Sequence, residues 1–203
     1  MFNFSPFGGY LALKLGPERS VFMDGRVNNA RDASLVVRAD RALTSAPAFQ
    51  DLVKEFDLQY AVMSAREGEH FGMPLARSRA WSLVHWDDVA AVYVRRQGPN
   101  APLAAAGYQL FRHLMDPGEV LNAAIQGGVV APLLQHDARL AVAQDPNSAR
   151  AAFFLACGEL AARNRPGFLS ALQRLSALAP EHPAIRVLSD SFERLSAEPQ
   201  APH

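Results

Sequence analysis

The pattern of apolar residues changes character near residue 97 of this 203-residue chain. Before that point, short runs rich in β-branched and aromatic residues alternate with runs of helical periodicity. After it, nearly every segment beyond the loop GPNAP has the apolar spacing of a helix. We therefore predict two domains, an α/β domain over residues 1–97 and an all-helical domain over residues 98–203.

The first domain has the order of elements that a small mixed sheet requires. Strand candidates lie at 20–24 (SVFMD), at 58–64 (LQYAVMS) and at 81–96, the last read as an antiparallel hairpin that turns at Asp87 and Asp88. Helix candidates lie at 30–43, at 48–56 and, as one or two turns, at 73–80. A strand, a helix and a second strand with tight connections are typical of a βαβ unit. We expect a mixed sheet of about four strands with flanking helices.

Two prolines in the second domain, Pro146 and Pro180, are separated by 34 residues, which is the period of the tetratricopeptide repeat. Helix candidates between and around these prolines lie at 129–144, 149–162, 168–178 and 184–195. We expect them to form tetratricopeptide-like helical hairpins. Because about two repeats do not bury their apolar faces alone, we also expect the helices to dock on the α/β domain.

Composition and charge exclude several classes of protein. Basic and acidic side chains both number 20, so the chain lacks the basic surface that binds nucleic acid. The apolar runs are too interrupted to span a bilayer, and no signal peptide is visible. The single cysteine, Cys157, excludes a disulfide and a cysteine-rich metal site, and we expect its side chain to be buried. No metal ion and no cofactor is predicted.

The candidates for chemistry lie at the ends of the expected strands. Asp24 and Arg26 flank Gly25 at the end of the expected first strand, where open α/β sheets place ligand-binding residues. Such a pair can bind a hydroxylated or anionic ligand, or the three residues can form only a turn. Asp87 and Asp88 at the hairpin tip, with His85, allow a metal-binding or acid–base interpretation, but a two-residue hairpin turn also favours such polar residues without any ligand. No motif combines a nucleophile with a base, so catalysis by the isolated chain is not predicted.

Three segments carry a resemblance to a known family: residues 2–26, 54–64 and 81–96, followed by the repeat-like helices. Together they resemble the soluble C-terminal region of bacterial multi-spanning membrane proteins of the glycosyltransferase-C-like kind. The resemblance is strongest at Gly8, Gly9, Tyr10, Leu11, Asp24, Gly25, Arg26, Trp81, Val84, Asp87 and Asp88. It implies an α/β domain on the extracytoplasmic, periplasmic side of a membrane, with membrane contact and glycosyl-transfer chemistry confined to an upstream segment. Without the resemblance, we would expect a cytoplasmic protein.

The first function that we expect is that of a non-catalytic interaction module of a membrane-associated protein. Its partner would be a protein or peptide bound at the helical repeats, with a glycan as the second candidate. The first helices of such repeats line a concave face, here residues 149–162, with Arg150 and Arg163 near its edges. These arginines can bind a carboxylate or a phosphate. The alternative is that the α/β domain or the terminal helix covers this face.

The second function is that of the substrate-binding part of a membrane carbohydrate-processing, glycosyltransferase-like enzyme. In that case Asp24, Arg26 and Asp88 would contact a sugar or a phosphate. The two functions place the binding site in different domains, so they predict different residues at the ligand.

Overall fold

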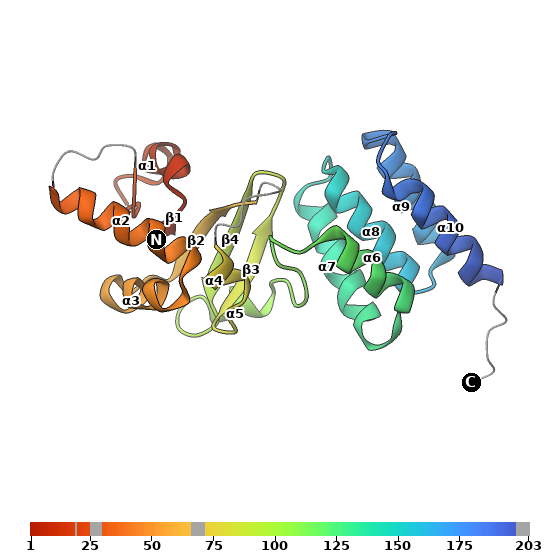
Figure 1. Cartoon of the computed structure of the whole chain (residues 1–203), viewed down its shortest axis with the longest axis horizontal. Helices are drawn as coiled ribbons and strands as arrows, with labels where there is room; N and C mark the ends of the chain where they lie inside the picture. The colour runs from red at the N-terminus through yellow and green to blue at the C-terminus, as the bar shows by residue number, and fades with distance from the viewer. Residues whose placement is uncertain (19, 25–29, 66–71, 198–203) are drawn as a thin grey trace. The chain divides into compact units, whose positions relative to one another are not determined.

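The computed structural model describes residues 1–18, 20–24, 30–65 and 72–197. Its contacts divide the chain into two compact units (Figure 1). The α/β unit comprises Met1–Tyr108 and Arg112–Leu114, and the helical unit comprises Gln109–Phe111 and Met115–His203. The first unit extends beyond the predicted boundary at residue 97 because α5 (Ala101–Ala105) packs on the sheet. The hydroxyl of Ser82 donates a hydrogen bond of 3.0 Å to the carbonyl oxygen of Ala104 and so fixes α5 to the sheet.

Within the described residues, the sheet of the α/β unit has four strands in the order β1-β2-β4-β3. They are β1 (Phe2–Asn3), β2 (Tyr60–Ser64), β3 (Trp81–Trp86) and β4 (Ala90–Arg95). β1 is parallel to β2, and the other neighbours are antiparallel. The prediction of a small mixed sheet is therefore confirmed, as are the hairpin and the strand before it.

The predicted strand at 20–24 is wrong, because these residues form no β-ladder. They are held instead by the buried side chain of Asn3 on β1. Its Oδ1 accepts hydrogen bonds from the backbone N–H groups of Phe22 (2.8 Å) and Met23 (3.2 Å), and its Nδ2 donates to the Met23 carbonyl (2.8 Å). A side-chain amide thus satisfies the backbone groups that a neighbouring strand would otherwise pair.

Helices cover one face of the sheet. They are α2 (Ala30–Thr44), α3 (Ala46–Phe56) and α4 (Met73–Ala76), and η1 (Ser5–Phe7) and α1 (Gly8–Leu15) precede them. Phe49 of α3 packs its ring against Phe2 (5.3 Å between ring centroids) and Trp81 (5.5 Å). These contacts join the two outer strands, β1 and β3, through one helix. The core therefore lies between α3 and this face of the sheet.

A β-bulge in β3 brings additional side chains to the same face. The pairing moves from Leu83 opposite Tyr93 to His85 opposite Val92, which leaves Val84 as an extra residue. Strict alternation would place Leu83 and Trp86 on opposite faces because they are three residues apart. The bulge brings both to the core side, and both side chains are buried.

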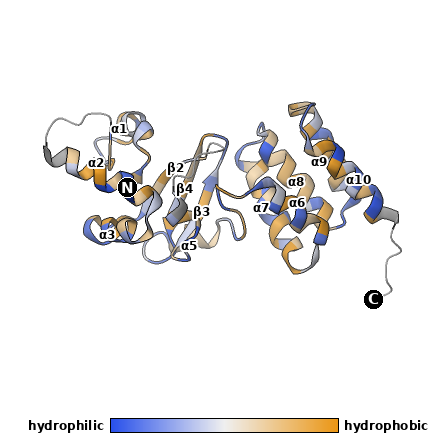
Figure 2. Ribbon diagram, in the orientation of Figure 1, coloured by the Kyte–Doolittle hydropathy of each residue, from blue (hydrophilic) through white to orange (hydrophobic). Residues whose placement is uncertain are grey.

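The helical unit is built around one enclosed helix. Its helices are α6 (Pro117–Gln126), α7 (Ala131–Gln144), α8 (Ala149–Ala161), α9 (Arg165–Leu178) and α10 (Ala184–Ala197), with η2 (Gly128–Val130) before α7. The four predicted helices are confirmed to within a few residues. α8 packs against α6, α7, α9 and α10, and none of its residues is exposed. Figure 2 shows its largely apolar colouring.

The helices of this unit recur at a regular interval. α9 begins and ends 34 residues after α7, and both contain 14 residues. The tetratricopeptide-like character of the hairpins stays a prediction. Among the described residues, no helix combines the length and apolarity needed to cross a bilayer.

Candidate functional site

The first predicted site lies only in part within the described residues. Asp24 is half-buried and directly follows the segment that Asn3 holds, whereas Gly25 and Arg26 lie outside the described residues. The backbone of Asp24 passes close to Gly8 of α1. A Cβ atom on Gly8 would lie 1.9 Å from the Met23 carbonyl oxygen and 2.6 Å from the Asp24 Cα. Asp24 therefore stands at a close backbone crossing that only glycine at position 8 permits.

The hairpin tip is organised by Asp87. Its Oδ1 accepts hydrogen bonds of 2.7 Å from the backbone N–H groups of Val89 and Ala90, and its Oδ2 lies 3.1 Å from His85 Nε2. Burial by itself raises the pKa of Asp87, but the two N–H groups and His85 outweigh it, so that the pKa lies below its usual value. Asp88 is exposed at the tip. Asp24 lies near β1, and Asp88 lies at the tip of the β3–β4 hairpin. Strand β2 lies between β1 and this hairpin in the sheet.

The two predicted partner-binding arginines differ in their surroundings. Arg150 is half-buried; its guanidinium lies over the Phe154 ring (5.7 Å), and its Nη2 donates to the Met115 carbonyl (3.4 Å). Arg163 is exposed in the turn after α8, with a φ of 54°. The open face predicted along 149–162 is covered by the neighbouring helices, α10 among them. This covering is one of the alternatives that the sequence left open.

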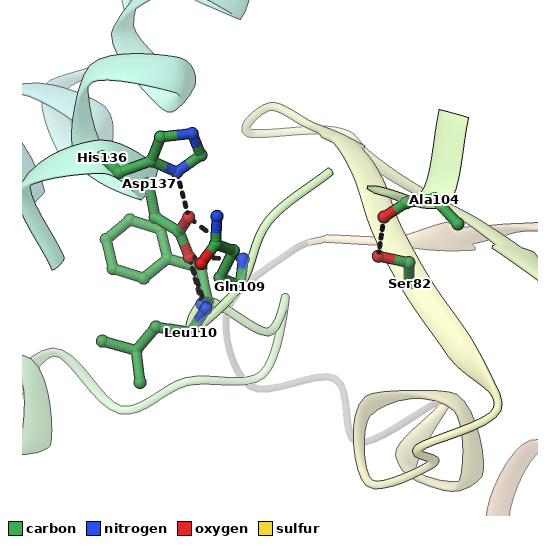
Figure 3. Close-up of polar contacts among 7 residues, drawn as sticks. Ser82, Ala104, Gln109, Leu110, His136 and Asp137 are labelled. Atoms are coloured by element: carbon green, nitrogen blue, oxygen red, sulfur yellow. Dashed lines mark hydrogen bonds and ion pairs between the residues drawn. The ribbon is translucent and has the colours of Figure 1, made fainter. Parts of the chain in front are cut away.

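A buried carboxylate not predicted from the sequence, Asp137 of α7, binds the backbone of a distant segment (Figure 3). Its Oδ2 accepts hydrogen bonds from the N–H groups of Gln109 (3.0 Å), Leu110 (2.6 Å) and Phe111 (2.8 Å). Its Oδ1 lies 2.9 Å from His136 Nδ1. Three successive N–H groups that converge on one anion form a backbone nest. Asp137 thus serves as the anion of this nest.

The side chain of Phe111 continues the same contact. It is 1% exposed, and its ring centroid lies 4.8 Å from that of Phe154 on α8. Backbone and side chain of the segment 109–111 are therefore both bound by the helical unit. We call the acceptor, formed by Asp137 of α7 and Phe154 of α8, the clamp.

A second buried carboxylate, Glu159, joins three elements of the helical unit. Its oxygens accept hydrogen bonds from Gln135 Nε2 (2.9 Å) and Arg139 Nε (3.0 Å) on α7, and from Asn164 Nδ2 (2.6 Å) before α9. A buried charge is tolerated when its partners satisfy it in this way. Glu159 therefore fixes the helices around the clamp.

The α/β unit contains a buried pair of titratable groups, Tyr93 and His113. The Tyr93 hydroxyl lies 2.8 Å from His113 Nδ1, and both side chains are 1% exposed. Burial raises the pKa of Tyr93, and its hydrogen bond with the His113 backbone acts in the opposite direction. This pair attaches residues 112–114 to β4.

Among the described residues, no group of three or more histidine, cysteine, aspartate or glutamate side chains is arranged to hold a metal ion. Comparison with known proteins finds no matching family model, no matching curated protein and no matching solved structure. The resemblance to glycosyltransferase-C-like membrane proteins therefore stays a prediction.

Proposed function

We propose that this chain is a non-catalytic interaction module whose helical unit binds a polypeptide segment of a partner protein. The observation that carries the proposal is the clamp, which already binds one irregular segment, residues 109–111. Asp137 accepts hydrogen bonds from backbone groups that nearly every residue possesses, and Phe154 contacts the aromatic ring of Phe111. Recognition of main chain plus one anchoring side chain is a common basis of peptide binding.

The spacing of the helices supports a tetratricopeptide-like organisation as the finer part of this proposal. The 34-residue interval between α7 and α9 equals the repeat period, and α8 is followed by α10 after a similar interval. Stacked helical hairpins of this kind commonly bind peptides. Because neighbouring helices cover α8, we place the proposed site at the clamp, formed by α7 and α8, and not along the whole of residues 149–162.

The geometry of the clamp defines the chemistry of the partner segment. Three consecutive residues must each have a free backbone N–H group, which excludes proline from all three positions. The third residue should be aromatic, because its side chain takes the place of Phe111 beside Phe154. The extracytoplasmic, membrane-associated setting and a glycan as second partner remain parts of the proposal that the resemblance alone supports.

The experiment supplies the segment as a separate molecule. A fluorescein-labelled peptide with the sequence of residues 107–116 is titrated with the full chain, and binding is followed by fluorescence polarisation. In the parent protein the internal segment competes, so the apparent affinity is the intrinsic affinity multiplied by the small fraction of clamps that the internal segment leaves free. Phe111→Leu weakens the internal segment by removing its ring contact, and we expect this variant to bind the peptide at least tenfold more tightly than the parent.

Two matched controls identify the contacts. A peptide with proline in place of the leucine that corresponds to Leu110 lacks one of the three N–H groups and should bind at least tenfold more weakly. Adding Asp137→Asn to the Phe111→Leu variant should weaken binding by a similar factor. The proposal is wrong if the folded Phe111→Leu variant, checked by circular dichroism, does not bind the peptide, or if the proline peptide binds equally well.

A further inference from the structure

The α/β unit contains a crevice of about 300 Å³ between α2 and α3, which are adjacent in the fold. Its apolar floor is Leu52, which is 1% exposed, and Pro47 contributes to its wall. Arg41 on α2 and Asp51 on α3 carry opposite charges at its rim. Arg38 also lines the crevice, but its guanidinium forms an ion pair with Glu55. The crevice therefore combines an apolar surface with one cationic group, Arg41, and one anionic group, Asp51, whose side chains are not already paired among the described residues.

Among the described residues, the side chains of Arg41 and Asp51 form no hydrogen bond or ion pair, in contrast to the side chain of their neighbour Arg38. Arg38 forms an ion pair with Glu55, and its Nη1 donates to Glu55 Oε1 at 3.2 Å. The hydrogen bond with Glu55 is the main cause of the raised pKa of Arg38, and the charge of Asp51 adds to it. Asp51 thus lies close enough to Arg38 for its charge to act on that guanidinium.

We propose that this crevice binds a free α-amino acid with an apolar side chain. The carboxylate of the ligand pairs with Arg41, its ammonium group pairs with Asp51, and its side chain lies against Pro47 and Leu52. This inference concerns a different unit from the clamp and does not depend on the proposed function.

The charge arrangement selects a zwitterion over a simple ion. An anion without an ammonium group would meet the carboxylate of Asp51, and a cation without a carboxylate would meet the guanidinium of Arg41. Each would leave one charge of the crevice without its counterpart. The Ser45 hydroxyl, whose oxygen accepts from the Ala48 N–H at 3.5 Å, retains a hydrogen that can be donated to the ligand carboxylate.

The volume of the crevice agrees with a ligand of this size. Pockets for small molecules begin at about 300 Å³, so the crevice suits one amino acid rather than a nucleotide or an oligosaccharide. The exposed ring of Pro47 provides the apolar surface that favours a ligand such as leucine or phenylalanine over glycine.

The test is a titration of the ¹⁵N-labelled full chain with L-leucine and L-phenylalanine, followed by two-dimensional NMR. We expect saturable shifts of the amide signals confined to residues 38–52. Two analogues of phenylalanine separate the charges: 3-phenylpropionate lacks the ammonium group, and 2-phenylethylamine lacks the carboxylate. Each analogue should bind at least tenfold more weakly than L-phenylalanine.

Variants assign the contacts to the two residues. Arg41→Gln and Asp51→Asn should each weaken L-phenylalanine binding at least tenfold, and both residues are exposed, so the fold should tolerate the changes. Arg79→Gln and Asp40→Asn are matched controls, because they change exposed residues of the same unit that do not line the crevice. The inference is overturned if neither amino acid gives saturable shifts, if either analogue binds as tightly as L-phenylalanine, or if both crevice variants bind it like the parent.

Discussion

Replacement of Asp137 is the most direct test of the physical role assigned to the clamp. Its carboxylate is fully buried and accepts hydrogen bonds from three successive backbone N–H groups. A hydrogen bond to a charged group contributes about 1.5–3 kcal/mol. The N–H groups of Gln109 and Leu110 are only partly buried and can bind water after the change, whereas that of Phe111 is buried. We therefore expect Asp137→Ala to lower the free energy of unfolding by about 3 kcal/mol rather than by the full sum.

Asp137→Asn should have a smaller effect, about 1–2 kcal/mol, because the amide keeps one accepting oxygen but loses the charge. The stabilities are measured by urea denaturation followed by circular dichroism. Hydrogen exchange then localises the change. If the free energy of unfolding falls by about 3 kcal/mol, the amide of Phe111 should exchange about 100-fold faster.

Asp190→Asn is the matched control, since it changes an exposed aspartate of the same unit, with an expected effect within about 0.5 kcal/mol. The assignment is refuted if Asp137→Ala lowers the stability by less than about 1 kcal/mol. It is also refuted if the amides of 109–111 already exchange as fast in the parent as in the variant.

Three further predictions concern other contacts. Gly8→Ala should destabilise the fold by about 1–3 kcal/mol because its Cβ meets the Met23 carbonyl, whereas Gly9→Ala, whose Cβ meets open space, should leave thermal stability equal or slightly higher. Because the folded-state pKa of Asp87 is lowered, its contribution to stability is complete at neutral pH and is lost as the pH falls below about 5; Asp87→Asn should flatten this loss in urea midpoints measured against pH. The Cys157 thiol, buried and with a raised pKa, should react with a thiol reagent only after unfolding, and rapid labelling of the native chain would contradict its burial.

The sequence predicts those elements whose pattern is long enough to show a period. The hairpin of β3 and β4, the strand β2 and the helices α7 to α10 all have such patterns, and the structure confirms them. β1 has only two residues, so no alternation can reveal it. The segment at 20–24 has the composition of a strand, but the Asn3 side chain takes up its backbone groups. Propensity cannot predict that competition, since it depends on a contact between distant residues.

The candidate sites follow a similar rule. The sequence predicts Asp24 and Asp88 as site residues because they lie at the ends of expected strands. At Asp88 the structure has a hairpin turn, which the neighbouring Asp87 organises. Asp137 had one signal that sequence reasoning did not use. The buried positions Leu134, Ala138 and Ala141 place residue 137 on the inward face of α7, where an acid requires partners. The identity of those partners, residues 109–111, is a tertiary property.

The pairing of β1 also has a consequence for folding during synthesis. Strand β1 leaves the ribosome before its partner β2, which includes Ala61, and Tyr93 meets His113 later still. Asn3 can hold Phe22 and Met23 only loosely before the sheet exists, because an isolated short strand is not stable. The α/β unit therefore cannot complete its core until residues 112–114 have been translated. The helical unit, in contrast, can add each helix to its predecessor as the chain grows.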